Sequence, residues 1–162
     1  MQSHPTLSDV FPLPNETKRL RVFLGNWGVE GALTFMGTSF TLKGSATFSE
    51  AAAGWGILVI AKLTIETLGN YEEADLLAFS KNENLYHFFA VTNTAAVYDH
   101  KGNWQDDETL NFVYEGLQNG KSYREELSIR ISNSLQFTIK ERDFVDNQVV
   151  TTLSVFLTKK PD

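Results

Sequence analysis

Two glutamates are the residues most suited to acid/base chemistry, because each interrupts an otherwise apolar strand face. The period-2 pattern of residues 122–131 places Glu125 on the apolar face, and that of residues 135–144 does the same for Glu141. On neighbouring strands the two carboxyl groups would face each other, which couples their ionisation and raises at least one pKa. They could then act as an acid/base pair. The alternatives are that a bulge or register slip returns them to water, or that arginines pair with them.

His87 is a second candidate, since an imidazole titrates near neutral pH. It lies in a predicted strand, residues 85–91, on the same face as Phe89. It could therefore line a pocket or act as a general base, or it could be a core histidine with a hydrogen-bond partner. His100 precedes a predicted turn at Lys101-Gly102 and is expected to be exposed.

Other reactive motifs are absent from the sequence. The chain has no cysteine, which excludes disulfides, thiolate metal sites and cysteine nucleophiles. It also has no phosphate-binding glycine loop, no nucleophile elbow and no His-Glu-x-x-His helix. The acidic run Asp106-Asp107-Glu108 lacks the spacing and the glycine of a calcium loop, so a solvated loop is expected there. We therefore predict neither a metal site nor a cofactor, and no residue is identified as catalytic.

The composition of the 162-residue chain indicates a single globular domain with a hydrophobic core, since 42% of its residues are hydrophobic and 21% are charged. Its net charge of −6 argues against nucleic-acid binding, which needs a concentrated basic face. No run is apolar enough for a membrane span, and the first residues lack the order of a signal peptide. Together with the absence of cysteine, these features predict a cytoplasmic protein.

One short helix and a series of strands are predicted to position these residues. Three of the four prolines lie in residues 1–14, which we interpret as a flexible N-terminal arm. A helix is expected from Asn15, because apolar residues then recur at helical spacing as far as Trp27, which should pack the helix end across the barrel floor. Strands are predicted at residues 28–35, 40–49, 56–67, 72–80, 85–91, 95–100, 109–116, 122–131, 135–144 and 149–158.

The strands form a predicted β-meander, because short turn signals separate them. Asn119-Gly120 is the strongest of these signals. A sheet with one polar and one apolar face can close into a barrel, which hides the apolar face and removes the exposed edges. We therefore predict an all-β fold with one short N-terminal helix, an antiparallel up-and-down barrel of about eight to ten strands. A single domain is expected over residues 15–162.

Aromatic residues are numerous, with 12 Phe, 5 Tyr and 3 Trp. They could simply fill the barrel interior, or they could line a cavity for a small ligand beside a few polar groups. Under the second interpretation the cavity candidates are Trp55, His87, Phe89, Phe112, Tyr114, Tyr123, Glu125, Phe137 and Glu141.

A short helix ending at Gly25-Asn26-Trp27, followed by a meander of strands, resembles the plan of the calycin group, which comprises the lipocalins and fatty-acid-binding proteins. The segments Leu24-Gly25-Asn26-Trp27, Lys101-Gly102-Asn103-Trp104 before Thr109-Leu110, and Gly120-Lys121-Ser122-Tyr123-Arg124 together resemble a bacterial family of uncharacterised lipocalin-like proteins, the DUF1579 type. The resemblance covers roughly residues 15–160 and implies a closed or nearly closed barrel but no known activity.

The nitrobindins are a related barrel family that binds haem through a histidine late in the chain. Here all three histidines lie at or before residue 100, so this resemblance does not extend to haem binding.

Three functions are compatible with these features. The first is a cytoplasmic barrel that binds a small hydrophobic or amphipathic molecule, oriented by Tyr114, Tyr123, His87 and Glu125. The second is a cofactor-free isomerase, lyase or hydrolase in the same cavity, with His87 or Glu125 as acid/base. The third is a structural homodimer, which would have a filled interior and a large apolar patch outside.

Overall fold

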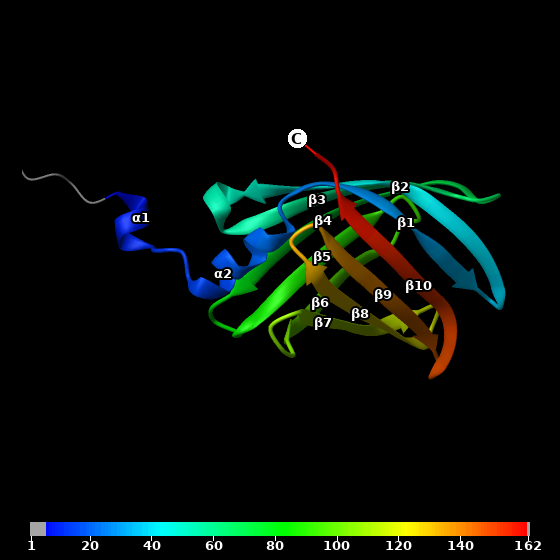
Figure 1. Ribbon diagram of the computed structural model, residues 1–162. Helices are drawn as coiled ribbons and strands as arrows, with labels where there is room; N and C mark the ends of the chain where they lie inside the picture. The colour runs from blue at the N-terminus through cyan, green and yellow to red at the C-terminus, as the bar shows by residue number, and fades with distance from the viewer. Residues whose placement is uncertain (1–5, 162) are drawn as a thin grey trace, which may run out of the picture.

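Ten antiparallel strands form a closed barrel in the computed structural model, which describes residues 6–161 (Figure 1). The strands are β1 (Gly25–Phe35), β2 (Thr38–Ala51), β3 (Gly56–Ile65), β4 (Gly69–Ser80), β5 (Leu85–Thr92), β6 (Val97–Trp104), β7 (Thr109–Gln118), β8 (Lys121–Asn133), β9 (Gln136–Val145) and β10 (Gln148–Lys159). Each strand pairs with the next along the chain, and β1 pairs with β10 to close the barrel. The predicted all-β, up-and-down barrel is therefore confirmed.

Tight turns at one end of the barrel set the strand register. Asn119 and Gly120 have φ angles of 52° and 77°, as a two-residue turn of the hairpin type requires, so the predicted turn between β7 and β8 is confirmed. Pairs with positive φ also occur at Met36-Gly37 and Asp146-Asn147. All three turns follow odd-numbered strands of an antiparallel meander, so they lie at the same end, which we call the mouth end.

The opposite end of the barrel, the helix end, carries the N-terminal helical segments. The predicted helix consists of α2 (Asn15–Arg19) and a 3-10 helix, η1 (Leu20–Phe23). Its N-cap residue is Pro14, and Asn15 is its first helical residue. In the arm, the short helix α1 (Leu7–Val10) has no buried residue, and residues 1–5 lie outside the described part of the chain. Within residues 6–161, no helix is both long and apolar enough to cross a membrane.

An aromatic cluster closes the helix end. Phe23 of η1 and Trp27 of β1 are fully buried, and the Trp27 indole N–H donates a 2.8 Å hydrogen bond to the carbonyl oxygen of Phe23. The ring of Phe137 lies 4.6 Å from that of Trp27 and 5.7 Å from that of Phe48, both edge to face. Trp27 therefore has the structural role that the sequence predicts, and Phe137 belongs to this aromatic plug.

The β6 strand corrects one predicted turn. Residues 101–103 are not a turn but the continuation of β6, in which Gly102 pairs with Phe112 of β7 and Tyr86 of β5. A Cβ atom at Gly102 would lie 1.8 Å from the backbone oxygen of Asn111, so glycine is needed here for close backbone approach rather than for a turn. The consequence is that His100 lies within a strand.

Candidate functional site

A cavity of about 620 Å³ occupies the barrel interior above the aromatic plug. Its rim includes Phe35, Leu68, Thr94 and Gln118, which belong to the mouth end or to the strand ends beside it. The cavity therefore opens at the end of the barrel opposite the N-terminal helical segments. Figure 1 shows these segments at one end of the barrel.

The wall formed by β1, β2, β3 and β10 is apolar. Inward positions recur every second residue along these strands, as the pleat requires. The cavity-lining side chains of this wall are Val29, Leu33, Phe35, Leu42, Ala46, Phe48, Val59, Ala61, Leu63, Ile65, Val150, Leu153, Val155 and Leu157, with Thr151 as its one polar member. Such a wall favours an apolar ligand surface, since burial of that surface against it removes both from water.

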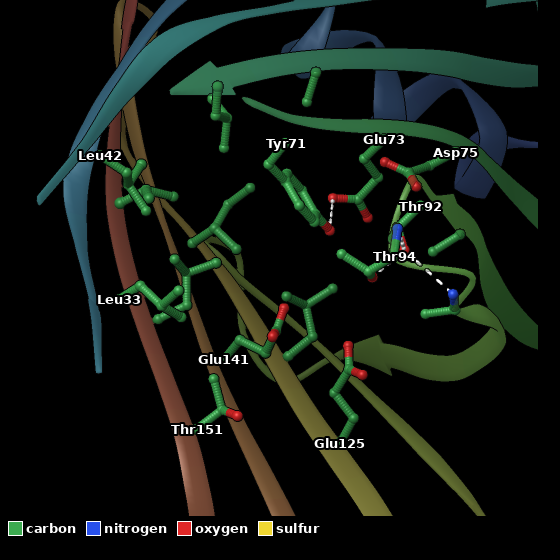
Figure 2. Close-up of a pocket in the computed structure, with 18 of the residues that line it drawn as sticks. Leu33, Leu42, Tyr71, Glu73, Asp75, Thr92, Thr94, Glu125, Glu141 and Thr151 are labelled. Atoms are coloured by element: carbon green, nitrogen blue, oxygen red, sulfur yellow. Dashed lines mark hydrogen bonds between the residues drawn. The ribbon is translucent and has the colours of Figure 1, made fainter. Parts of the chain in front are cut away.

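The acidic wall, as we call it, consists of side chains from the neighbouring strands β8 and β9 and from β4, which lies across the barrel from them. It presents five carboxyl groups to the same cavity, from Glu73, Asp75, Glu125, Glu141 and Asp143. Figure 2 shows Tyr71, Glu73 and Asp75 of β4 pointing into the space that Glu125 and Glu141 also enter, and the Tyr71 hydroxyl donates a 3.0 Å hydrogen bond to Glu73. The cavity thus has one apolar side and one polar, negatively charged side.

Glu125 of the acidic wall forms a buried pair with His100, which does not line the cavity. The Nε2 atom of His100 lies 2.7 Å from Glu125 Oε1, and its Nδ1 lies 3.1 Å from the carbonyl oxygen of Phe88. Both partners are acceptors, so a ring protonated on both nitrogens satisfies them. Burial by itself lowers the pKa of His100, but these hydrogen bonds and the Glu125 charge outweigh it and raise the pKa above its ordinary value. The Tyr123 hydroxyl donates a further 2.9 Å bond to Glu125.

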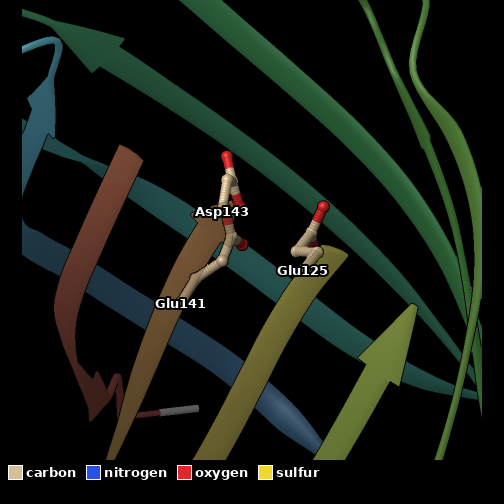
Figure 3. A group of neighbouring side chains, drawn as sticks. All are labelled: Glu125, Glu141 and Asp143. Carbon is tan, nitrogen blue, oxygen red and sulfur yellow. The ribbon is translucent and has the colours of Figure 1, made fainter. Parts of the chain in front are cut away.

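Glu125, Glu141 and Asp143 form a close group on the neighbouring strands β8 and β9 (Figure 3). Glu125 and Asp143 are Cα partners in the sheet, and Glu141 is two residues earlier on the same face of β9. One oxygen from each of the three lies within 4.8 Å of the others, so the group can share one cation. The sequence predicts no metal site, and it does not by itself reveal that these three oxygens meet.

Burial and nearby negative charge raise the pKa values of Glu73, Asp75, Glu141 and Asp143. Burial, followed by the charge of Glu125, raises the pKa of Glu141 well above its ordinary value and that of Asp143 to about 6. On β4, burial followed by the charge of Glu73 raises the pKa of Asp75 to about 10, and burial also raises that of Glu73. The acidic wall is therefore only partly ionised near neutral pH.

Three of the nine predicted cavity residues line the cavity: Tyr123, Glu125 and Glu141. Tyr114 is not among the lining residues, and its ring lies 6.1 Å from that of Tyr123. Phe112 is fully buried, and its ring lies 5.7 Å from that of Phe88. The predicted inward faces of β7, β8 and β9 are correct. Phe112 and Tyr114 do not line the cavity, although their β8 partners Leu127 and Glu125 do.

Three other predicted residues are placed away from the cavity. His87 and Phe89 are on the outer face of β5, because Tyr86, Phe88 and Ala90 occupy its inner face. The His87 Nδ1 lies 3.0 Å from Asp99 Oδ1, and Phe89 is 42% exposed. Trp55 follows the 3-10 helix η2 (Ala52–Gly54) at the helix end. The expectation that these three line the cavity is wrong, because both faces of β5 are apolar in sequence and Trp55 lies before β3 begins.

His100, Glu73, Asp75 and Asp143 are site residues that the sequence interpretation missed. His100 is only 1% exposed, not solvated as expected. Glu73 and Asp75 alternate with outward residues along β4 just as Glu141 and Asp143 do along β9. The signal that could have found them is therefore a third strand with acidic residues on its core-facing side.

No family model matches the sequence, and no curated protein matches it. Among solved structures, the chain is similar to an S-type phycobiliprotein lyase, CPES from Guillardia theta, with a TM-score of 0.60 and 10% identity over 98% of this chain and 99% of that chain. It is also similar to a redesigned beta barrel, mFAP0, bound to DFHBI, with a TM-score of 0.51 and 12% identity over 85% of this chain and 99% of that chain. At these identities the likeness shows the fold alone.

Proposed function

We propose that this protein binds a small amphipathic molecule inside its barrel. The cavity of about 620 Å³, open at the mouth end, is the observation that carries the proposal. Its volume falls within the range of roughly 300 to 1,000 Å³ that is typical of small-molecule sites. Ten strands enclose a wider interior than eight, which gives the fold room for a ligand above its aromatic plug.

The two-sided lining supports an amphipathic rather than a purely apolar ligand. The apolar wall from β1, β2, β3 and β10 suits a hydrocarbon or aromatic body, and the carboxyl and tyrosine groups of the other wall offer partners that fix its orientation. The structural neighbours give further support, since one is a designed barrel bound to the small molecule DFHBI and another is a phycobiliprotein lyase.

A fluorescence titration with N-phenyl-1-naphthylamine, a neutral probe that brightens in apolar sites, tests this proposal. We expect saturable, one-to-one binding with micromolar affinity. Ala46→Phe should weaken it about tenfold or more, because Ala46 lines the cavity and a larger side chain takes the probe's space. Ala32→Phe is the matched control, since Ala32 is exposed on the outer face of β1.

Circular dichroism of both variants shows that they fold. Absence of saturable binding to the parent, or equal loss in the cavity variant and its control, would contradict binding inside the barrel.

A second proposal, proton-transfer catalysis without a cofactor, is favoured by the pKa of about 6 for Asp143. A carboxyl group poised near neutral pH can accept and return a proton, and this one faces a cavity that also contains the Tyr123–Glu125 hydrogen bond. The test is turnover of a small ester and of a β,γ-unsaturated ketone. Activity that Asp143→Asn abolishes supports it, and equal activity in the variant contradicts it.

We further propose that the chain belongs to the DUF1579-type family, that it is located in the cytoplasm and that it forms a homodimer. An outer apolar patch on β3, β4 and β5 supports the dimer, because the exposed side chains of Leu58, Leu76 and Phe89 come from paired positions of adjacent strands. Light scattering after size exclusion would show a dimer that Phe89→Lys converts to a monomer. A monomeric parent at high concentration would rule the dimer out.

A further inference from the structure

The charge balance of the cavity is one-sided. Five carboxyl groups reach it, and among residues 6–161 no lysine, arginine or histidine lines it. His100 lies behind Glu125 and pairs with that carboxylate. Glu73, Asp75, Glu141 and Asp143 thus share the cavity without a basic side chain in its lining. Carboxylates placed together in a low-dielectric interior are destabilising unless a cation or a proton joins them.

Asp75 is a second, independent observation that favours a bound donor here. The residue is only 3% exposed, yet its Oδ1 atom has no hydrogen-bond partner among the described residues. It lines the cavity, where Figure 2 shows its carboxyl group beside Glu73. Asp143 Oδ1, on β9, is also buried without a partner. Unsatisfied buried acceptors of this kind are rare in native structures and call for a donor.

The carboxyl groups of β8 and β9 lie close together in one region of the cavity. The Glu125, Glu141 and Asp143 oxygens lie within 4.8 Å of one another, a spacing that a single ammonium group with three N–H donors can bridge. The pKa values of Asp75 and Glu141 are raised mainly by burial. Neighbouring negative charges, including that of Glu125, raise them further. One positive group placed here therefore acts on carboxyl groups from β4, β8 and β9 together.

We infer that the bound molecule is an organic cation, whose ammonium or amidinium group lies against the carboxylates of β4, β8 and β9 and whose apolar body lies along the wall of β1, β2, β3 and β10. This inference rests on the proposed function and names the class of its ligand. A lone metal ion would satisfy the carboxylates but would leave the long apolar wall and most of the cavity without a partner.

Isothermal titration at pH 7.5 with three ten-carbon ligands tests the inference directly. Decylammonium, decanol and decanoate share the same apolar body and differ in the charge of the polar group. We expect decylammonium to bind about tenfold or more tighter than decanol, as charge-assisted hydrogen bonds imply, and decanoate to bind most weakly because carboxylates repel it.

Neutral substitutions in the acidic wall separate the charge effect from the apolar one. Glu141→Gln and Asp75→Asn each remove a carboxyl group that can give up its proton when the cation binds. Each should therefore weaken decylammonium binding about ten- to hundredfold and change decanol binding by less than about twofold. The matched control is Glu115→Gln, because Glu115 is exposed on the outer face of β7. It should leave both affinities unchanged.

The outcomes distinguish this inference from the proposed function. Equal binding of decanol and decylammonium, or equal loss of both in the variants, overturns the cation and leaves a ligand-binding barrel. Failure of all three ligands while N-phenyl-1-naphthylamine still binds overturns the cation alone, and failure of that probe as well overturns both. Titration with Ca²⁺ and Mn²⁺ is the remaining arm: tight binding that Glu141→Gln abolishes, without a preference for decylammonium, would replace the organic cation with a metal ion.

Discussion

Asp143→Asn should stabilise the unliganded protein at neutral pH. Asp143 faces the cavity from β9, next to its Cα partner Glu125. Burial, and after it the charge of Glu125, raises the pKa of Asp143 from its ordinary value of 3.8 to about 6. Asparagine has nearly the same shape but cannot ionise, so the variant removes a carboxylate that the fold disfavours and keeps a polar side chain in its place.

The size and sign of the effect follow from proton linkage. In the folded protein the carboxyl group keeps its proton up to a pH of about 6, whereas in the unfolded chain it ionises near pH 4. The free energy of unfolding therefore falls as pH rises between these values, and the loss is complete above the folded pKa. About two pKa units at about 1.4 kcal/mol each give about 3 kcal/mol. The variant should gain about 2 to 3 kcal/mol over the parent at pH 7.5 and almost nothing at pH 4.

Urea denaturation followed by tryptophan fluorescence at pH 4, 5, 6 and 7.5, at constant ionic strength, measures this difference. Protein refolded from denaturant avoids carry-over of a cellular ligand, which would stabilise the parent. Glu115→Gln, on the outer face of β7, controls for the loss of one negative charge. A stability difference between Asp143→Asn and the parent that is the same at pH 4 and pH 7.5, or a variant less stable than the parent at pH 7.5, would refute the reasoning.

Four further substitutions test the packing of the barrel and its buried ion pair by urea or thermal unfolding. Trp27→Ala should lower the free energy of unfolding by about 3 to 5 kcal/mol, because it empties the aromatic plug; parent-like stability would remove that role. Gly102→Ala should destabilise far more than Gly120→Ala, since a Cβ at Gly102 would lie 1.8 Å from the Asn111 oxygen, whereas Gly120 has open space and only its φ of 77° as a penalty of about 1 to 2 kcal/mol. His100→Gln should cost about 3 kcal/mol or more by leaving a buried carboxylate without its cation. Because the pKa of His100 is raised, that loss should be larger at pH 6 than at pH 9, and an equal loss at both would argue against an imidazolium.

Where one strand face is clearly apolar, the sequence predicts both the strand and the direction of its side chains. This holds for β8, where Tyr123 and Glu125 face inward, and for β9, where Glu141 does. It fails for β5, because residues on both faces of that strand are apolar and periodicity cannot choose between His87 and Tyr86. The difference lies in the contrast between the two faces, which is the information that period-2 alternation carries.

Glycine in β6 shows a second limit. Gly102 between Lys101 and Asn103 has the composition of a turn, yet it continues the strand because the β7 backbone passes too close for a side chain. That close approach belongs to the pairing of two strands, so no local pattern reveals it. The interpretation of His100 as an exposed residue beside a turn was wrong for the same reason.

The sequence alone determined that the chain is a meander of antiparallel strands with tight turns and that isolated acidic residues lie on apolar faces, because turn chemistry and side-chain alternation are local properties. Only the tertiary structure decided that acids from β4, β8 and β9 meet at one cavity, and that His100 pairs with Glu125. Closure of the barrel brings strands far apart in sequence onto one interior. The distances between their charges, and hence their pKa values and the kind of ligand they favour, depend on that closure.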